Sequence, residues 1–172
     1  MTRSFSVKAR RVAAAAMLAC WLLAGCDPQR ISELEEGVAS EADVRARFGE
    51  PEKIWDGAGG ARILEYNRQP AGQKNYMITI DAGGRMSALR QVLNAANFER
   101  IQPGMMMEEV RRTLGKPAKA ITYSLKNETA WDWRYLQLPH TPMVFTVWFS
   151  PDYRVLRTSM TPDPDAMENQ GK

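Results

Sequence analysis

The chain reads Asp43-Val44-Arg45-Ala46-Arg47-Phe48-Gly49-Glu50-Pro51 in its first half and Glu109-Val110-Arg111-Arg112-Thr113-Leu114-Gly115-Lys116-Pro117 in its second, at a constant offset of 66 residues. Each stretch places two apolar residues four positions apart, which puts them on one face of a helix. A glycine then supplies the left-handed residue that ends a helix, and the proline after it cannot continue the turn. The pattern predicts a short helix in each half, capped by Ser40 in the first and lacking a capping oxygen at Met106 in the second.

The correspondence extends into the strands that follow. Ile78-Thr79-Ile80 ahead of Arg85 aligns with Val147-Trp148-Phe149 ahead of Arg154 at an offset of 69 residues, and a loop of different length accounts for the change. Alternating apolar residues predict strands over 62–67, 75–81 and 86–93, and then over 121–125, 131–135, 143–149 and 154–160. The sequence therefore predicts an α+β fold of two tandem αα-β units, each with two short helices packed on a small antiparallel sheet.

The N-terminus has the pattern of a bacterial lipoprotein signal. Four basic residues and no acidic one precede an apolar run over 12–23, which is too short to cross a membrane as a helix because that takes about 20 residues. Leu23-Ala24-Gly25-Cys26 resembles the lipobox that lipoprotein signal peptidase recognises. We expect cleavage before Cys26 and a covalent lipid on its thiol. An ordinary secretory signal and a core helix are the alternatives, and Cys20 is a poorer match to the lipobox.

These features divide the chain into five segments. Residues 1–25 are the expected signal peptide, 26–30 a lipidated tether, 31–94 the first unit, 95–160 the second, and 161–172 a flexible tail. The whole sequence has 23 Lys and Arg and 20 Asp and Glu, but four of the basic residues lie in the signal, so residues 26–172 carry 19 against 20 and a formal charge of −1. No basic stripe with interleaved aromatic residues occurs, which argues against nucleic-acid binding.

The second half resembles a known lipoprotein family. The pattern consists of Ile101-Gln102-Pro103-Gly104-Met105, Val110, Leu114-Gly115-Lys116-Pro117, Trp133 and Tyr135. With the lipobox, it is similar to the BamE family (also called SmpA or OmlA), whose members belong to the β-barrel assembly machinery. The first half matches this pattern more loosely, at Val44, Phe48 to Pro51 and Tyr66. The resemblance implies two BamE-like units, partners among the assembly subunits, and an accessory role in outer-membrane protein assembly and envelope integrity.

A second resemblance implies a different function. Two departures from the BamE pattern are the tandem arrangement and Met106, which stands where that family has a threonine. The tandem arrangement resembles the secreted β-lactamase inhibitor proteins, although those are stapled by disulfides and this chain has only Cys20 and Cys26. It implies a periplasmic binding or inhibitor module for another envelope protein.

The sequence offers little catalytic chemistry. His140 is the single histidine and lies in a predicted hairpin loop, so a zinc site of the usual nitrogen and sulfur ligands cannot be assembled in one chain. There is no Gly-x-Ser-x-Gly nucleophile motif and no glycine-rich phosphate loop in the required context. We expect no enzyme activity, no metal and no cofactor beyond the lipid on Cys26.

Apolar residues outside the helix pattern are candidates for a partner surface. Trp148 is out of register with the inward residues of its strand, so it packs between the two units or meets a partner. Met105 and Met106 are likewise candidates either for packing in the core or for contact with a partner. The expected location is the cell envelope, anchored by lipid and facing the periplasm. The family resemblance favours the outer membrane, whereas Asp27, directly after Cys26, favours the inner membrane.

Overall fold

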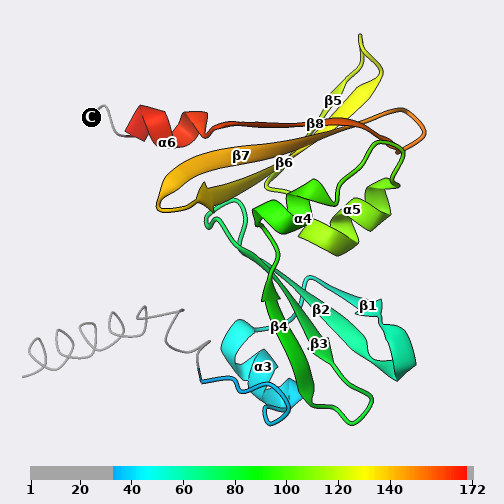
Figure 1. Ribbon diagram of the computed structural model, residues 1–172, viewed down its shortest axis with the longest axis vertical. Coiled ribbons are helices and arrows are strands. Elements are labelled where there is room, and N and C mark those ends of the chain that lie inside the picture. The colour runs from blue at the N-terminus through cyan, green and yellow to red at the C-terminus, as the bar shows by residue number, and fades with distance from the viewer. Residues whose placement is uncertain (1–32, 170–172) are drawn as a thin grey trace, which may run out of the picture. The chain divides into compact units, whose positions relative to one another are not determined.

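The computed structural model describes residues 33–169 and contains two four-stranded antiparallel sheets (Figure 1). The first sheet has the order β1-β2-β3-β4 and the second the order β5-β6-β7-β8. The strands are β1 (Lys53–Asp56), β2 (Arg62–Asn67), β3 (Asn75–Ile80), β4 (Met86–Gln91), β5 (Lys119–Tyr123), β6 (Glu128–Gln137), β7 (Thr141–Phe149) and β8 (Val155–Pro162). The helices are α3 (Glu41–Phe48), η2 (Ala58–Gly60), α4 (Ala95–Glu99), α5 (Met107–Leu114) and α6 (Pro164–Asn169). No helix in these residues is both long and apolar enough to span a bilayer.

The predicted fold class is wrong, because the molecule is mostly β. Ahead of the first sheet the described residues form one α-helix, α3, and the segment where a second helix was expected hydrogen-bonds to β4 instead. The N–H of Gly37 donates to the carbonyl of Met86 at 2.7 Å, and the N–H of Met86 donates to Ala39 at 2.8 Å. Each sheet has four strands. The sequence analysis did not predict β1, because its four residues are too few to show alternation of apolar and polar side chains.

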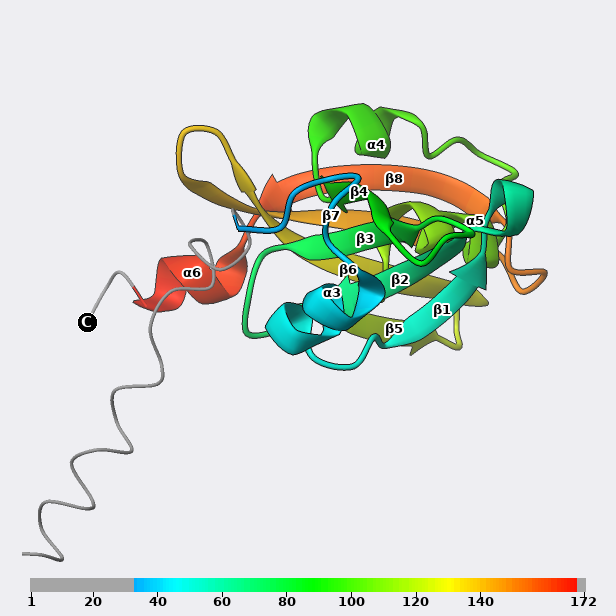
Figure 2. The same ribbon diagram turned by 90° about the horizontal axis from the view of Figure 1, so that it is seen from below.

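One face of the first sheet packs against α3 (Figures 1 and 2). The helix begins at Ser40, whose Oγ accepts from the N–H of Asp43 at 3.2 Å, while the carboxylate of Asp43 accepts from the N–H of Ser40 at 2.9 Å. Val44 and Phe48 are buried, and the ring of Phe48 lies 5.0 Å from that of Tyr66 between centroids. The predicted cap and helix face are present.

One face of the second sheet packs against α4 and α5 and holds the larger core. Its buried members are Leu93, Phe98, Ile101, Val110, Leu114, Trp133, Tyr135, Phe145, Val147, Phe149 and Val155. At the start of α5 the side chain of Met106 caps nothing, and the carboxylate of Glu109 accepts from the N–H of Met106 at 2.7 Å. Beyond Thr161, where the sequence predicted a flexible tail, β8 continues to Pro162 and α6 follows.

The two halves repeat local details at the aligned positions. Ser40 forms a bridge with Arg85 and Met106 forms the equivalent bridge with Arg154. The hydroxyl of Tyr66 donates to the carbonyl of Gly49 at 3.1 Å, and the indole N–H of Trp133 donates to that of Gly115 at 3.0 Å. The glycines differ from the expected left-handed geometry: Gly49 has φ 82° and ψ −159°, a region that is almost exclusive to glycine.

The second face of the first sheet joins it to α5. The carboxylate of Glu65 is fully buried and accepts from the N–H of Lys116 at 2.8 Å, from the indole of Trp55 at 3.1 Å and from Arg111 at 3.2 Å. The amide of Asn75, also fully buried, donates to the carbonyl of Leu114 at 2.8 Å. The C-terminal end of α5, whose carbonyls lack partners within the helix, is thereby fixed to β2 and β3.

Candidate functional site: an apolar cavity beside the β6–β7 hairpin

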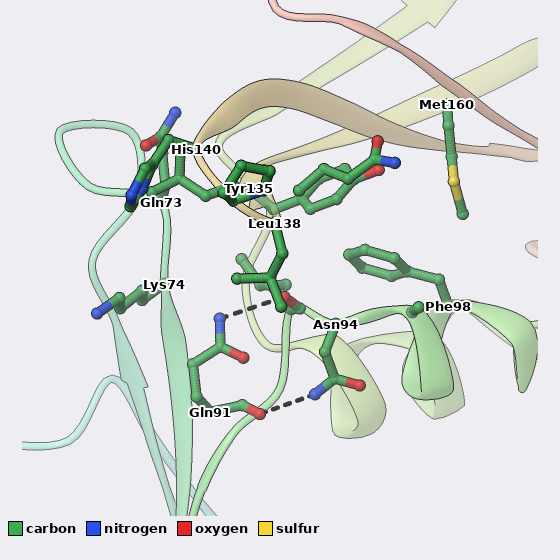
Figure 3. Close-up of a pocket in the computed structure, with 14 residues that line it drawn as sticks. Gln73, Lys74, Gln91, Asn94, Phe98, Tyr135, Leu138, His140 and Met160 are labelled. Carbon is green, nitrogen blue, oxygen red and sulfur yellow. Dashed lines mark hydrogen bonds between the residues drawn. The ribbon is translucent and has the colours of Figure 1, made fainter.

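A cavity of about 610 Å³ opens between the β6–β7 hairpin, α4 and the end of β4 (Figure 3). This volume is in the range of sites that hold small ligands or the side chains of a partner. The residues that line it are Gln73, Lys74, Gln91, Leu93, Asn94, Ala95, Phe98, Tyr135, Leu136, Gln137, Leu138, Pro139, His140 and Met160. They come from four separate stretches of the chain, which the fold brings together.

The floor of the cavity is rigid and aromatic. Phe98 stacks on Phe145 with 4.3 Å between ring centroids and lies edge-on to Tyr135 at 4.7 Å. Both Phe98 and Tyr135 are buried in the core of the second sheet, and burial raises the pKa of Tyr135. Its hydroxyl is therefore neutral at physiological pH and remains a hydrogen-bond donor.

The mouth of the cavity is apolar and open to water. Leu138 is 88% exposed, Met160 49% and Leu136 39%. Figure 3 shows Leu138 between the end marked by Gln73 and His140 and the end marked by Phe98 and Met160. Single exposed apolar residues are common on protein surfaces, but three around one cavity make this the candidate site.

The rim carries amides instead of carboxylates. The side chain of Gln91 donates to the carbonyl of Leu93 at 3.2 Å, and that of Asn94 donates to the carbonyl of Gln91 at 2.9 Å. The side-chain oxygen of Asn94 caps α4 by accepting from the N–H of Asn97 at 3.1 Å. These bonds hold the segment 91–94 in place. Lys74 is the one lining residue with a permanent charge.

The hairpin that forms the upper wall is fixed at its base. The side chain of Gln69 donates to the carbonyl of Arg134 at 2.6 Å and accepts from its N–H at 3.1 Å, as a further strand would. The guanidinium of Arg134 pairs with the buried carboxylate of Asp163 at 2.7 Å. Residues 136–140 extend beyond this anchored base, so the apolar tip is presented at a defined position.

The residues singled out from the sequence lie elsewhere. Leu23, Ala24, Gly25 and Cys26 fall outside the described residues. Met105 packs against the core of the second sheet, and Met106 is 37% exposed at the start of α5. Trp148 lies on the opposite face of the sheet, 5.4 Å from the ring of Tyr123 and 4.5 Å from the guanidinium of Arg157. The structure therefore does not bring the two methionines and Trp148 into one surface.

His140 is in the hairpin loop, as expected, but it also lines the cavity. Within residues 33–169 no group of three or more His, Cys, Asp and Glu side chains could hold a metal ion. The sequence analysis missed Phe98, Leu138 and Met160. The available signal was Leu136 and Leu138, two leucines at the end of a hairpin, where polar residues are the rule.

No protein-family model matches the chain, and no curated protein matches it. Among solved structures it is similar to a DUF4309 family protein, YjgB, of Bacillus subtilis, with 20% identity, 79% of this chain and 86% of that chain covered, and a TM-score of 0.32. It is also similar to a "putative beta-lactamase inhibitor protein" of Streptococcus mutans, with 12% identity, coverage of 72% and 82%, and a TM-score of 0.32.

The resemblance to the BamE family is wrong. The two sheets of four strands differ from the expected units of two helices on a small sheet, and no family model matches the chain. The short motif with Gly115 and Pro117 indicates the end of a helix, and such helix ends occur in many folds.

Proposed function

We propose that this protein is a binding module of the bacterial cell envelope that holds an apolar segment of another envelope protein in the cavity beside the β6–β7 hairpin. The observation that carries the proposal is the exposed apolar mouth formed by Leu136, Leu138 and Met160 over an aromatic floor. An apolar centre in a pocket is where binding energy concentrates at protein interfaces.

The polar groups around the cavity favour a peptide as the occupant. The rim has the amide of Gln73 and the side-chain oxygen of Gln91, which can donate to and accept from a peptide backbone. A single lysine and no carboxylate give a nearly neutral lining, which suits an uncharged segment. The proposed role is binding without catalysis, and His140 is one of the residues that line the cavity.

The expected envelope location completes the proposal. Cys26, with lipid on its thiol, anchors the module so that it faces the periplasm, and an envelope protein is then the accessible partner. The proposed role in outer-membrane assembly rested on the BamE resemblance and has no separate support. Labelling cells with a fatty-acid probe tests the anchor: Cys26→Ser should abolish the label, whereas Cys20→Ser should leave it. A label that persists in Cys26→Ser contradicts the anchor.

The cavity is tested by site-specific photo-crosslinking. A photoreactive aromatic residue replaces Leu138 in the full chain, and Leu125, which is fully exposed in the β5–β6 turn, provides a matched control. We expect a covalent adduct with one envelope protein from position 138 and none from 125. Equal adducts from both positions, or adducts with lipid alone, contradict the proposal.

Affinity for the identified partner supplies the second measurement. Leu138→Ser should weaken binding about 30-fold, corresponding to about 2 kcal/mol for a central apolar contact. Leu125→Ser should not change the affinity. Since both leucines are exposed, neither change should alter the unfolding transition, and a loss of binding in Leu138→Ser cannot then be ascribed to misfolding.

A further inference from the structure

A second cavity, of about 200 Å³, lies on the face of the second sheet that is opposite α4 and α5. Asp132, Arg134 and Val144 line it. Along β6 and β7 these residues alternate with Trp133 and Phe145, which belong to the core that packs against the two helices. None of the residues that line this cavity lines the one beside the β6–β7 hairpin, so the two sites are separate.

One wall of this cavity consists of charged groups that already bind one another. The guanidinium of Arg134 bonds to the buried carboxylate of Asp163 at 2.7 Å and donates to the carbonyl of Pro70 at 3.3 Å. The carboxylate of Asp165 lies 4.0 Å from the same guanidinium. These contacts fix the wall, so the groups that are available to a ligand lie elsewhere in the cavity.

Lys119 and Asp132 are the charged residues of the lining that remain available. They lie directly opposite each other in the pairing of β5 with β6, and both line the cavity. Within residues 33–169 the ammonium of Lys119 forms no hydrogen bond or ion pair. One oxygen of Asp132 accepts from the hydroxyl of Thr146 at 2.7 Å, and in the same part of the chain the other oxygen accepts none. A molecule in the cavity therefore meets an unpaired cation and an unpaired carboxylate oxygen.

We infer that this cavity binds a small free α-amino acid. The carboxylate of the amino acid pairs with the ammonium of Lys119, and its own ammonium donates to the second oxygen of Asp132. A zwitterion matches the lining better than a simple ion, because an anion would leave Asp132 without a partner and a cation would leave Lys119 without one. A terminus of a protein chain carries only one of the two charges, so the ligand is a free molecule.

The size and the walls of the cavity limit the amino acid to one with a short side chain. Its volume has room for about six or seven water molecules, and alanine has close to that number of non-hydrogen atoms. The apolar residues of the lining are Pro70, Ala118, Val144 and Pro164, which suit a methyl group. Alanine is therefore the probe that matches both the charges and the volume.

Titration of the full chain in mild detergent, followed by the NMR signals of its backbone amides, tests the site. The probes are both enantiomers of alanine, propionate, which is alanine without its ammonium, and ethylamine, which is alanine without its carboxylate. We expect one enantiomer of alanine to shift the signals of Lys119, Asp132 and Val144 to saturation. Its affinity should exceed that of propionate and of ethylamine by about tenfold or more, because each of these lacks one charged contact.

Every other outcome overturns the inference. Propionate that binds as tightly as alanine would show a site for anions, and ethylamine that binds as tightly would show a site for cations. Shifts that do not saturate with any probe would show that the cavity holds no such ligand. The photo-crosslink from position 138 depends on the other cavity, so failure of the amino-acid site and failure of the proposed function are distinguishable.

Two variants test the assigned contacts. Lys119→Met keeps a long side chain without its charge, and Asp132→Asn keeps an oxygen for the hydroxyl of Thr146 without the negative charge. Each should weaken the binding of alanine about tenfold, because one charge of the ligand loses its partner. Lys126→Met, in the β5–β6 turn, is the matched control and should leave the affinity unchanged. Amide signals far from the cavity show whether each variant is folded, and an unchanged affinity in either folded site variant contradicts the assigned contact.

Discussion

The two sheets have the same strand order and similar helix contacts, but they differ in how much of each sheet remains exposed to solvent. The first sheet packs against α3 on one face and against α5 on the other, with Glu65 and Asn75 fully buried between β2, β3 and α5. The second sheet packs against α4 and α5 on one face. Its outer face carries Trp148 beside Tyr123 and Arg157, and its last strand is an open edge.

The longer strands of the second sheet explain the difference in exposure. β6 has ten residues and β7 nine, whereas β2 and β3 have six each. The added length carries the hairpin past the short helix α4, and the cavity forms where the hairpin overhangs it. In a duplicated pattern, one copy can therefore act as the support while the other gains the surfaces available to partners.

The largest expected effect comes from breaking the contact that lets the first sheet support the second. Glu65→Ala leaves the guanidinium of Arg111, the N–H of Lys116 and the indole of Trp55 without their acceptor. Losing one partner of a buried ion pair should lower the free energy of unfolding by about 3–5 kcal/mol. Urea denaturation measures the loss. Glu52→Ala, which removes a surface pair with Lys116, is the control and should leave the midpoint unchanged. A shift no larger than the control's would mean that Glu65 does not join the halves.

The aligned glycines give a smaller, paired test. Gly49 has φ 82° and open space where a Cβ would stand, whereas at Gly115, with φ 77°, a Cβ would lie 2.9 Å from the side-chain nitrogen of Asn75. Gly49→Ala should cost about 1–3 kcal/mol from backbone strain alone. Gly115→Ala should cost about 1 kcal/mol more, because it also disturbs the bond from Asn75 to Leu114. Thermal unfolding of both variants compares them directly. Equal losses would show that the contact with Asn75 contributes nothing.

Much of the secondary structure could be predicted from local patterns. Val44 and Phe48 marked the face of α3, and Ser40 with Asp43 marked its start, because helix spacing and caps are local. Alternating apolar residues placed β2, β3 and β7, although β2 and β3 have buried residues on both faces. The pairing of residues 36–39 with β4 was not predicted, because β4 lies about 50 residues away in sequence.

The candidate site could not be predicted in the same way. Phe98, Tyr135 and Met160 each fit an ordinary core pattern, and only the fold shows that they surround a cavity. The BamE resemblance was wrong because it relied on a short motif. A helix that ends in glycine and proline indicates a local turn and does not identify a fold. The sequence correctly predicted that Trp148 lies on the other face of its strand from Phe145, Val147 and Phe149. Its neighbours Tyr123 and Arg157 could not be predicted, because they lie on other strands.

The smallest expected effect is a difference between the two halves in how their stability depends on pH. At the position where Trp133 bonds to Gly115, the first half has Tyr66, and burial raises the pKa of Tyr66 to about 12, while Arg45 acts in the opposite direction. Because the folded state holds this proton more tightly than the unfolded chain, whose tyrosines ionise near pH 10, the contribution is complete below about pH 10 and is lost as the pH rises toward 12. Tyr66→Phe should therefore reduce the loss of stability across this window, as measured by urea midpoints at intervals from pH 9 to 12. Trp133 does not titrate, so Trp133→Phe should lower the midpoints without changing their slope against pH. If Tyr66→Phe leaves the slope unchanged, the alkaline sensitivity belongs to another tyrosine, and Tyr135, whose pKa burial also raises, is then the residue to replace.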